Sequence, residues 1–354
     1  MKTTHQIFFS NSNNMQKIKT ESVDLVVTSP PYPIIELWDD LFSKINPEIK
    51  SALHVQNGLL AFELMHRELD KVWKEVYRVL KRGGITCINV GDAVRTIGEN
   101  FHVYSNHSRI LNSCFVLGFS ALPEIIWHKP TNAPNKFMGS GMLPPGAYVT
   151  LEHEFILILR KGGKREFKKA LEKLNRQESS YFWEERNDWF SDLWNIKGTS
   201  QGLNNETRER SAAFAFELAY RLINMFSVRG DIVLDPFLGT GTTTVAAMSS
   251  ERNSIGYELD PRFENIIIKR LEGIVEFANQ RINKRLQRHE NFVQRRLAQG
   301  KPLKYMNNAY GFPVMTKQEE NLIIHLLKTV DKIKNDLFEV VYDTQSKYSL
   351  DYSS

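Results

Sequence analysis

The feature that most constrains the fold is a glycine- and threonine-rich turn between two apolar segments. Residues 231–235 (DIVLD) are predicted to form a buried strand, and PFLGTGTT follows at 236–243. A helix is predicted from Thr244, and a second strand at 253–257 ends in Glu258. A strand, a tight turn, a helix and a further strand are typical of α/β proteins. The sequence therefore predicts a doubly wound, mostly parallel sheet.

Strands and helices also alternate in the N-terminal half. Residues 59–80 carry apolar side chains at helical spacing, and 85–90 form a short apolar run before Gly91 and Asp92. The same patterns predict helices at 105–118 and 214–226, and strands at 21–27, 124–127 and 155–159. Residues 130–148 and 162–205 follow no clean period and are predicted to be insertions, while the chain beyond about Pro261 is predicted to be helical and polar.

The composition favours a soluble globular enzyme. Of 354 residues, 42% are hydrophobic and 25% charged, which is ordinary for a globular protein. No apolar run approaches the roughly 18 residues of a membrane span, and the N-terminus lacks the apolar segment of a signal peptide. The cysteines, Cys87 and Cys114, lie in apolar segments and indicate neither a disulfide framework nor a metal site. We therefore expect a reducing cytoplasm and no metal.

Positive charge is concentrated in the C-terminal part of the chain. The net charge is +5, and residues 262–304 alone hold 11 Lys/Arg against 4 Asp/Glu, a local excess of +7. Such a stretch is either a solvated helical surface or a surface that contacts the phosphates of a nucleic acid. Both interpretations stay open at this point.

The turn at 236–243 has the character of a cofactor site. Its glycines let the backbone approach a ligand, and the N-terminus of the following helix presents free N–H groups. Glu258, at the end of the next strand, is placed to bind a ribose diol. The spacing differs from G-x-G-x-x-G, and the turn lacks the Gly-Lys-Ser/Thr of a phosphate-binding loop. An acidic turn without lysine suits a cofactor that carries a sulfonium and an amine rather than phosphates.

A second motif, Ser29-Pro30-Pro31-Tyr32, follows the strand at 21–27. In a doubly wound sheet, the carboxyl ends of the strands face the ligand. The two prolines stiffen the backbone and remove two donors, which leaves carbonyl groups free to accept hydrogen bonds from an amine. Ser29 adds an acceptor, and Tyr32 offers an aromatic face for a base. These groups could position the exocyclic amine of a base for an in-line methyl transfer.

Together the two motifs resemble those of the amino-methylating DNA methyltransferases of restriction–modification systems. Because the motif at 28–32 (TSPPY) precedes the one at 235–243, the chain is more narrowly similar to the permuted β class, in which the cofactor motif comes last. The resemblance covers about 7–271 and includes, beside the two motifs, the segments 33–40, 91–92, 127–130, 152–161, 192–196 and 216–223.

This resemblance implies an α/β, Rossmann-like class I S-adenosylmethionine-dependent methyltransferase fold: a twisted, mostly parallel sheet flanked by helices, with a target-recognition insertion and a helical C-terminal extension. The chain then divides into a catalytic half at 1–129, a target-recognition region at 130–205 with an interleaved core strand at 152–161, a cofactor-binding half at 206–271, and a basic helical extension at 272–354.

The resemblance also assigns roles to single residues. Glu258 would hold the ribose of S-adenosylmethionine, and residues 214–217 would lie near its methionine part. The full set of expected cofactor residues is Thr28, Phe214, Glu217, Asp235, Pro236, Phe237, Gly239, Thr240, Gly241, Thr242 and Glu258. Ser29, Pro30, Pro31 and Tyr32 would hold the target base. Asp92, at the end of a neighbouring strand, could accept a proton from the amine, orient Ser29, or merely cap the next turn.

The identity of the target base follows from the resemblance more than from physics. S-P-P-Y usually accompanies N4 of cytosine in this family and D/N-P-P-Y accompanies N6 of adenine, so cytosine N4 ranks first and adenine N6 second. Carbon-5 methylation is disfavoured because it requires a cysteine nucleophile. A non-catalytic S-adenosylmethionine-binding DNA-recognition protein is the alternative of a different class, and the intact Ser29 and Tyr32 argue against it.

The implied partners are double-stranded DNA, from which the base would be flipped, and a restriction endonuclease for the same site, in the cytoplasm of a prokaryote at its nucleoid. Lys129, Asn132, Asn135 and Lys136 are candidates for reading the sequence. The chain departs from the family at two places. It has Ser10-Asn11 where Gly-Asp is frequent, and Ser211-Ala212-Ala213 where His-Pro-Ala is frequent, and either change could weaken cofactor binding.

Overall fold

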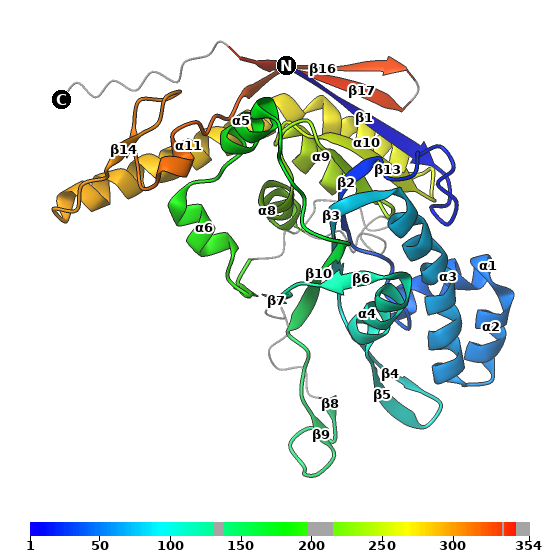
Figure 1. Cartoon of the computed structure of the whole chain (residues 1–354). Coiled ribbons are helices and arrows are strands. Elements are labelled where there is room, and N and C mark those ends of the chain that lie inside the picture. The colour runs from blue at the N-terminus through cyan, green and yellow to red at the C-terminus, as the bar shows by residue number, and fades with distance from the viewer. Residues whose placement is uncertain (130–137, 197–214, 335, 345–354) are drawn as a thin grey trace.

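The computed structural model describes residues 1–129, 138–196, 215–334 and 336–344. Its main sheet contains β1 (Lys2–Phe9), β2 (Val23–Thr28), β3 (Leu80–Val90), β6 (Phe119–Ala121), β7 (Ile125–His128), β10 (His153–Lys161), β11 (Leu193–Trp194), β12 (Ile232–Asp235), β13 (Asn253–Glu258), β16 (Leu326–Lys334) and β17 (Leu337–Asp343). The strand order is β11-β7-β10-β3-β2-β12-β13-β1-β17-β16, and β6 pairs with β10. Figure 1 shows this sheet running through the whole molecule.

Five neighbouring strands, β3-β2-β12-β13-β1, are mutually parallel. Their central residues are buried on both faces, and β2 is buried over its whole length, as expected of a parallel sheet covered by helices. The carboxyl ends of these strands lie along one edge. Ser29 follows β2, the glycine-rich turn follows β12, and Glu258 ends β13. The topology therefore brings together motifs that lie some 200 residues apart in the sequence.

Helices cover both faces of this sheet (Figure 1). They are α1 (Asp39–Ile45), α2 (Pro47–His54), α3 (Gly58–Val79), α4 (Asn106–Leu117), α5 (Ala170–Glu178), α6 (Trp183–Trp189), α8 (Phe216–Phe226), α9 (Thr242–Met248), α10 (Phe263–Glu272) and α11 (Ile274–Ala298), with 3-10 turns η1 (Glu36–Trp38) and η2 (Lys317–Glu319). The predicted α/β fold with a twisted, mostly parallel sheet is confirmed.

Helix α3 illustrates how the sequence determines an element. The side chain of Asn57 accepts a hydrogen bond from the N–H of Leu60 and caps the helix. Its apolar stripe, which includes Leu69, Trp73 and Val76, is buried against the sheet. The expected helix at 59–80 with a stop at 81–84 needs a small correction. The helix ends at Val79, and β3 begins at once at Leu80.

The C-terminal extension is helical only as far as Ala298. The chain then forms the short strands β14 (Tyr305–Met306) and β15 (Pro313–Val314), followed by the hairpin β16–β17. Strand β17 adds antiparallel to β1 and buries Phe338, Val340 and Tyr342. The expectation of an entirely helical region 272–354 is therefore wrong. The chain covers the edge of the parallel sheet with a hairpin, which removes an exposed strand edge.

The basic stretch at 262–304 forms α10 and α11, and three of its cations are used inside the protein. Arg285 is buried and binds both oxygens of Glu185 at 2.6 and 2.8 Å. Arg281 contacts Glu217, and Arg270 contacts the glycine-rich turn. These contacts join the extension to α6 and α8, so part of the positive charge serves internal packing rather than an external phosphate.

Two small hairpins project from the same end of the molecule (Figure 1). They are β4 (Ala93–Ile97) with β5 (Asn100–Tyr104), and β8 (Met138–Gly139) with β9 (Ala147–Tyr148). The rings of Phe101 and Tyr148 stack with centroids 4.5 Å apart and tie the hairpins together. The core strand expected at 152–161 within the target-recognition region is present as β10. Within the described ranges, every helix is too short or too polar to cross a membrane.

Candidate functional site

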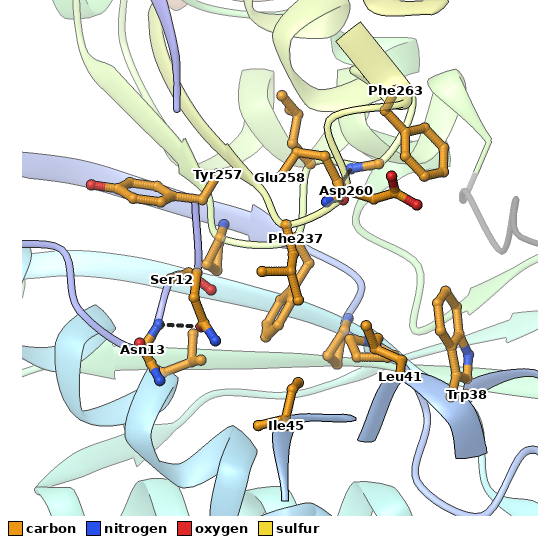
Figure 2. A pocket seen from close by; sticks show the side chains of 18 of the residues that line it. Ser12, Asn13, Trp38, Leu41, Ile45, Phe237, Tyr257, Glu258, Asp260 and Phe263 are labelled. Carbon is orange, nitrogen blue, oxygen red and sulfur yellow. Dashed lines mark hydrogen bonds between the residues drawn. The ribbon is translucent and has the colours of Figure 1, made fainter. Parts of the chain in front are cut away.

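A cavity of about 950 Å³ opens at the carboxyl ends of β1, β2, β12 and β13. Both motifs line it, and Figure 2 shows Phe237 projecting between Glu258 and Asp260 on one side and Leu41 and Ile45 on the other. The expected site residues that line the cavity are Ser29, Pro30, Pro31, Pro236, Phe237, Gly239, Thr240, Thr242 and Glu258. Ser10 and Asn11, which depart from the family pattern, also line it.

Asp235 lies behind the cavity wall and organises it. Its carboxylate accepts hydrogen bonds from Thr28 Oγ1 at 2.6 Å, Thr243 Oγ1 at 2.6 Å and Phe237 N at 3.0 Å. These bonds join the end of β2, the start of α9 and the cofactor turn. Burial raises the pKa of Asp235 to about 6, although the two hydroxyl donors and the amide lower it. Thr28 and Asp235 thus act on the cavity from its second layer.

Replacing Asp235 with asparagine should remove a pH dependence of stability. Because the folded-state pKa is raised, protonation stabilises the fold below about pH 4, and this contribution is lost as the pH rises through about 6. The wild-type free energy of unfolding should therefore fall by roughly 3 kcal/mol across that window. Asparagine cannot ionise, and Thr243 Oγ1 can donate instead to Val27 O, 3.3 Å away.

Chemical denaturation of the cofactor-free protein at a series of pH values measures this difference. Asp235→Ala serves as the contrast, because it strands three donors and should destabilise the protein at every pH. An asparagine variant whose stability follows the same pH curve as the wild type would contradict the assignment of the slope to Asp235.

Glu258 and the glycine-rich turn are held together by main-chain bonds. The N–H of Gly239 donates to Glu258 Oε2 at 2.7 Å, and the N–H of Asp260 donates to Oε1 at 2.8 Å. Burial raises the pKa of Glu258 to about 7, and the charges of Asp260 and Asp235 add to the rise. Each oxygen keeps a lone pair, so the carboxylate can still accept hydrogen bonds from a diol.

The turn itself is braced from behind by a buried cation. Arg270 of α10 donates from Nη1 to Thr240 O at 3.2 Å, Thr240 Oγ1 at 3.1 Å and Thr242 Oγ1 at 3.0 Å. Gly241, which caps α9, has a φ of +83° and needs the conformational freedom of glycine. Gly241 does not line the cavity but shapes the turn that does.

Ser29 and Tyr32 form the polar end of the site. Ser29 Oγ lies 3.1 Å from the hydroxyl of Tyr32, which donates to Glu154 Oε2 at 3.0 Å. Asn89 Nδ2 donates to the Tyr32 hydroxyl at 2.9 Å and to Glu154 Oε2 at 2.7 Å. Burial and the charge of Glu154 raise the pKa of Tyr32 well above 10, so its hydroxyl stays protonated.

Sequence reasoning missed Asn89 and Glu154. Glu154 lies in a segment noted only for its resemblance, and Asn89 lies inside an apolar run. The antiparallel pairing of β10 with β3, in which Phe155 faces Val90, brings their side chains to Tyr32. Lys129, a candidate for reading sequence, instead forms an ion pair with Glu154 at 2.6 Å. Asn132, Asn135 and Lys136 lie outside the described residues.

The position of Asp92 corrects an expectation. Its carboxylate accepts from the N–H of His107 at 3.1 Å and contacts His107 Nδ1 at 2.8 Å, at the start of α4. It forms a cap for that helix, which was the plainer of the alternatives, and does not contact Ser29. A carboxylate is favourable at a helix N-terminus, so the local sequence uses Asp92 for folding.

Glu217 is also placed differently from the expectation. It forms ion pairs with Arg281 at 2.8 Å and Arg221 at 2.9 Å and does not line the cavity. Burial would raise the pKa of Glu217, but the two guanidinium groups hold it below its ordinary value. Phe214 and the segment 211–213 lie outside the described residues.

The loop after Tyr32 has a strained backbone. Ile34 is buried and has a φ of +68°, a conformation that β-branched residues rarely adopt. Arg95 holds its carbonyl at 3.2 Å and also contacts Asp39. Strain of this kind persists where the surroundings enforce it, which is common at functional sites. The loop that carries Tyr32 is thus fixed before any ligand binds.

The donor set of the cavity fits an S-adenosyl cofactor. A buried carboxylate suits a ribose diol, the rings of Phe237, Trp38 and Phe263 suit a purine, and the turn at 236–243 contains no lysine for a phosphate. Ser29 lies in the same cavity, so a base amine held there would meet the cofactor. No group of three His, Cys, Asp or Glu side chains gathers for a metal in the described ranges.

Comparisons with known proteins agree with this geometry. The DNA methylase family model matches residues 23–269. The Type II methyltransferase M.MthZI of Methanothermobacter thermautotrophicus is 52% identical over 97% of this chain and 96% of its own length. M.MjaI of Methanocaldococcus jannaschii, also a Type II methyltransferase, is 50% identical over 76% of this chain and 91% of its own length.

Among solved structures, the Thermus thermophilus DNA modification methylase TTHA0409 in complex with S-adenosyl-L-methionine is similar. It is 33% identical, with a TM-score of 0.59 over 75% of this chain and 92% of that chain.

Proposed function

The chain belongs to the DNA methylase family of Type II methyltransferases, and we propose that it methylates N4 of cytosine in a specific sequence of duplex DNA. Its cofactor is S-adenosylmethionine and its substrate is DNA. The observation that carries the proposal is that Ser29 and Glu258 line one cavity at the carboxyl edge of the sheet. A base amine at Ser29 and a cofactor ribose at Glu258 would then lie on either side of the transferred methyl group.

S-adenosylmethionine supplies the methyl group. Glu258 would accept hydrogen bonds from the ribose hydroxyls, and Phe237 would pack against the cofactor. At the other end, Ser29 Oγ and the carbonyl groups of the Pro30-Pro31 segment would accept hydrogen bonds from the amine. Holding both amine protons in this way directs the nitrogen lone pair at the methyl carbon and excludes other orientations.

The choice of cytosine rests on Ser29. A neutral hydroxyl accepts a hydrogen bond from an amine at a smaller desolvation cost than a carboxylate. The family pattern, in which S-P-P-Y accompanies cytosine N4, supports the same choice. The proposal places the chain in the permuted β class, with base flipping from the duplex.

A methylation assay tests both the activity and the base. Mixed duplex DNA is incubated with methyl-labelled S-adenosylmethionine, and the nucleosides are then analysed. We expect label in N4-methylcytosine. Label in N6-methyladenine would show the same fold acting on the other base, and DNA binding without label would indicate a recognition protein that does not catalyse. A cognate endonuclease for the same site is a further part of the proposal.

The division of labour along the chain is likewise proposed. Residues 1–129 would supply the catalytic half, 206–271 the cofactor half and 130–205 the target-recognition region. The hairpins β4–β5 and β8–β9 extend from β3 and β10 close to Tyr32, which supports a role in DNA contact for this end of the molecule. The extension beyond 272 completes the sheet and packs against α6.

A further inference from the structure

Glu154 is the only carboxylate among the described residues that contacts Tyr32. Its side chain is 14% exposed, and its two oxygens accept from Tyr32, Asn89 and, at 2.6 Å, Lys129 Nζ. Three donors around one group, one of them an ammonium, are the surroundings of an ionised carboxylate. An ionised carboxylate accepts hydrogen bonds and donates none.

This fixed acceptor determines the direction of the neighbouring hydrogen bonds. Tyr32 has one hydroxyl proton, and it is given to Glu154. The Tyr32 oxygen can then only accept, from Asn89 at 2.9 Å and from Ser29 at 3.1 Å. The proton of Ser29 is therefore committed to Tyr32, and the lone pairs of Ser29 Oγ are left to accept a bond from elsewhere.

Two features of the packing indicate that this arrangement is maintained at a cost. Asn89 Oδ1 is buried and has no hydrogen-bond partner among the described residues, because its amide nitrogen faces Tyr32 and Glu154. A buried acceptor without a partner typically costs about 1–3 kcal/mol. A Cβ at Gly91 would lie 3.1 Å from the Tyr32 ring and 3.3 Å from Glu154 Cγ, so the approach of the two side chains favours glycine there.

We propose that Glu154 is a positioning residue that fixes the direction of the hydrogen bonds from Ser29 through Tyr32, so that Ser29 Oγ acts as an acceptor for the target amine. A serine hydroxyl by itself can donate or accept, and only acceptance suits an amine. The inference rests on the proposed function in one respect, namely that Ser29 receives the amine.

A double-mutant cycle tests the inference. Glu154→Gln, Tyr32→Phe and the combination are assayed on the same duplex DNA. Glutamine keeps the shape of Glu154 but introduces an amide that can donate, which frees the direction of the chain. We expect kcat to fall about tenfold in each single variant, with KM for DNA and for cofactor nearly unchanged. The double variant should be little slower than either single variant, because one chain is broken in all three.

Glu152→Gln is the matched control. It makes the same chemical change two residues away, at a side chain that is 48% exposed and remote from Tyr32, and it should leave kcat unchanged. Multiplicative losses in the cycle would overturn the inference, and so would a Glu154→Gln loss that merely follows a fall in melting temperature. The proposed function fails separately if Ser29→Ala keeps full activity. A slow Ser29→Ala variant without coupling between positions 32 and 154 would refute only the role of Glu154.

Discussion

Replacing Ser29 with alanine should lower kcat for DNA methylation roughly 100-fold, the usual loss when one preorganised hydrogen-bonding group at a reacting centre is removed. Ser29 Oγ lines the cavity and makes no contact with the cofactor turn, so binding of S-adenosylmethionine should change little. The reason for the loss is orientation: without this acceptor, the amine can turn its lone pair away from the methyl carbon. Steady-state kinetics and calorimetric titration of the cofactor measure the two quantities.

Ser22→Ala is the matched control for this variant. Ser22 lies just before β2, whereas Ser29 lies just after it, and the Ser22 hydroxyl bonds only to Lys19 O at 2.7 Å among the described contacts. The same substitution at the other end of the strand should leave kcat unchanged. Equal losses of turnover and cofactor affinity in Ser29→Ala would instead indicate that the loop had collapsed, and the role of Ser29 would be refuted.

The parallel centre of the fold could be predicted from the sequence because each strand there is a continuous apolar run with a sharp end. Prolines end β2, Gly91 follows β3 and the glycine-rich turn follows β12, so local signals coincide with the boundaries. The hairpin β16–β17 could not be recognised in this way. Its alternation is interrupted by Lys332 and Lys334, which face solvent, and its apolar face matters only once β1 offers an edge.

The site divides along the same lines. Ser29 and Glu258 were predicted because both directly follow or end a strand at the carboxyl edge, where position in the sequence fixes position in the fold. Asn89 and Glu154 depend on the register between β3 and β10, which no local pattern records. Asp92 also ends a strand, but the nearby start of α4 claims its carboxylate. Proximity to the edge therefore identified candidates without separating site residues from caps.

Glu258→Ala should weaken binding of S-adenosylmethionine roughly 100-fold, and Glu258→Gln about tenfold, because hydrogen bonds to a charged group contribute about 1.5–3 kcal/mol each. The wild-type affinity should also depend on pH. Burial raises the pKa of Glu258 to about 7 in the free protein, whereas the ribose hydroxyls donate best to the ionised form. Below about pH 7 the protein must release a proton on binding, so the affinity should fall by up to about tenfold for each further pH unit.

Calorimetric titrations over a range of pH values separate this effect from general electrostatics. In Glu258→Gln the pH dependence should disappear, because glutamine does not titrate. Asp40→Asn is the control, since Asp40 lines the same cavity from α1 and its replacement removes one negative charge without touching β13. It should keep the wild-type pH profile. A Glu258→Gln variant whose affinity still falls toward low pH would assign the titration to another group, and the ribose would then have to be held by residues other than Glu258.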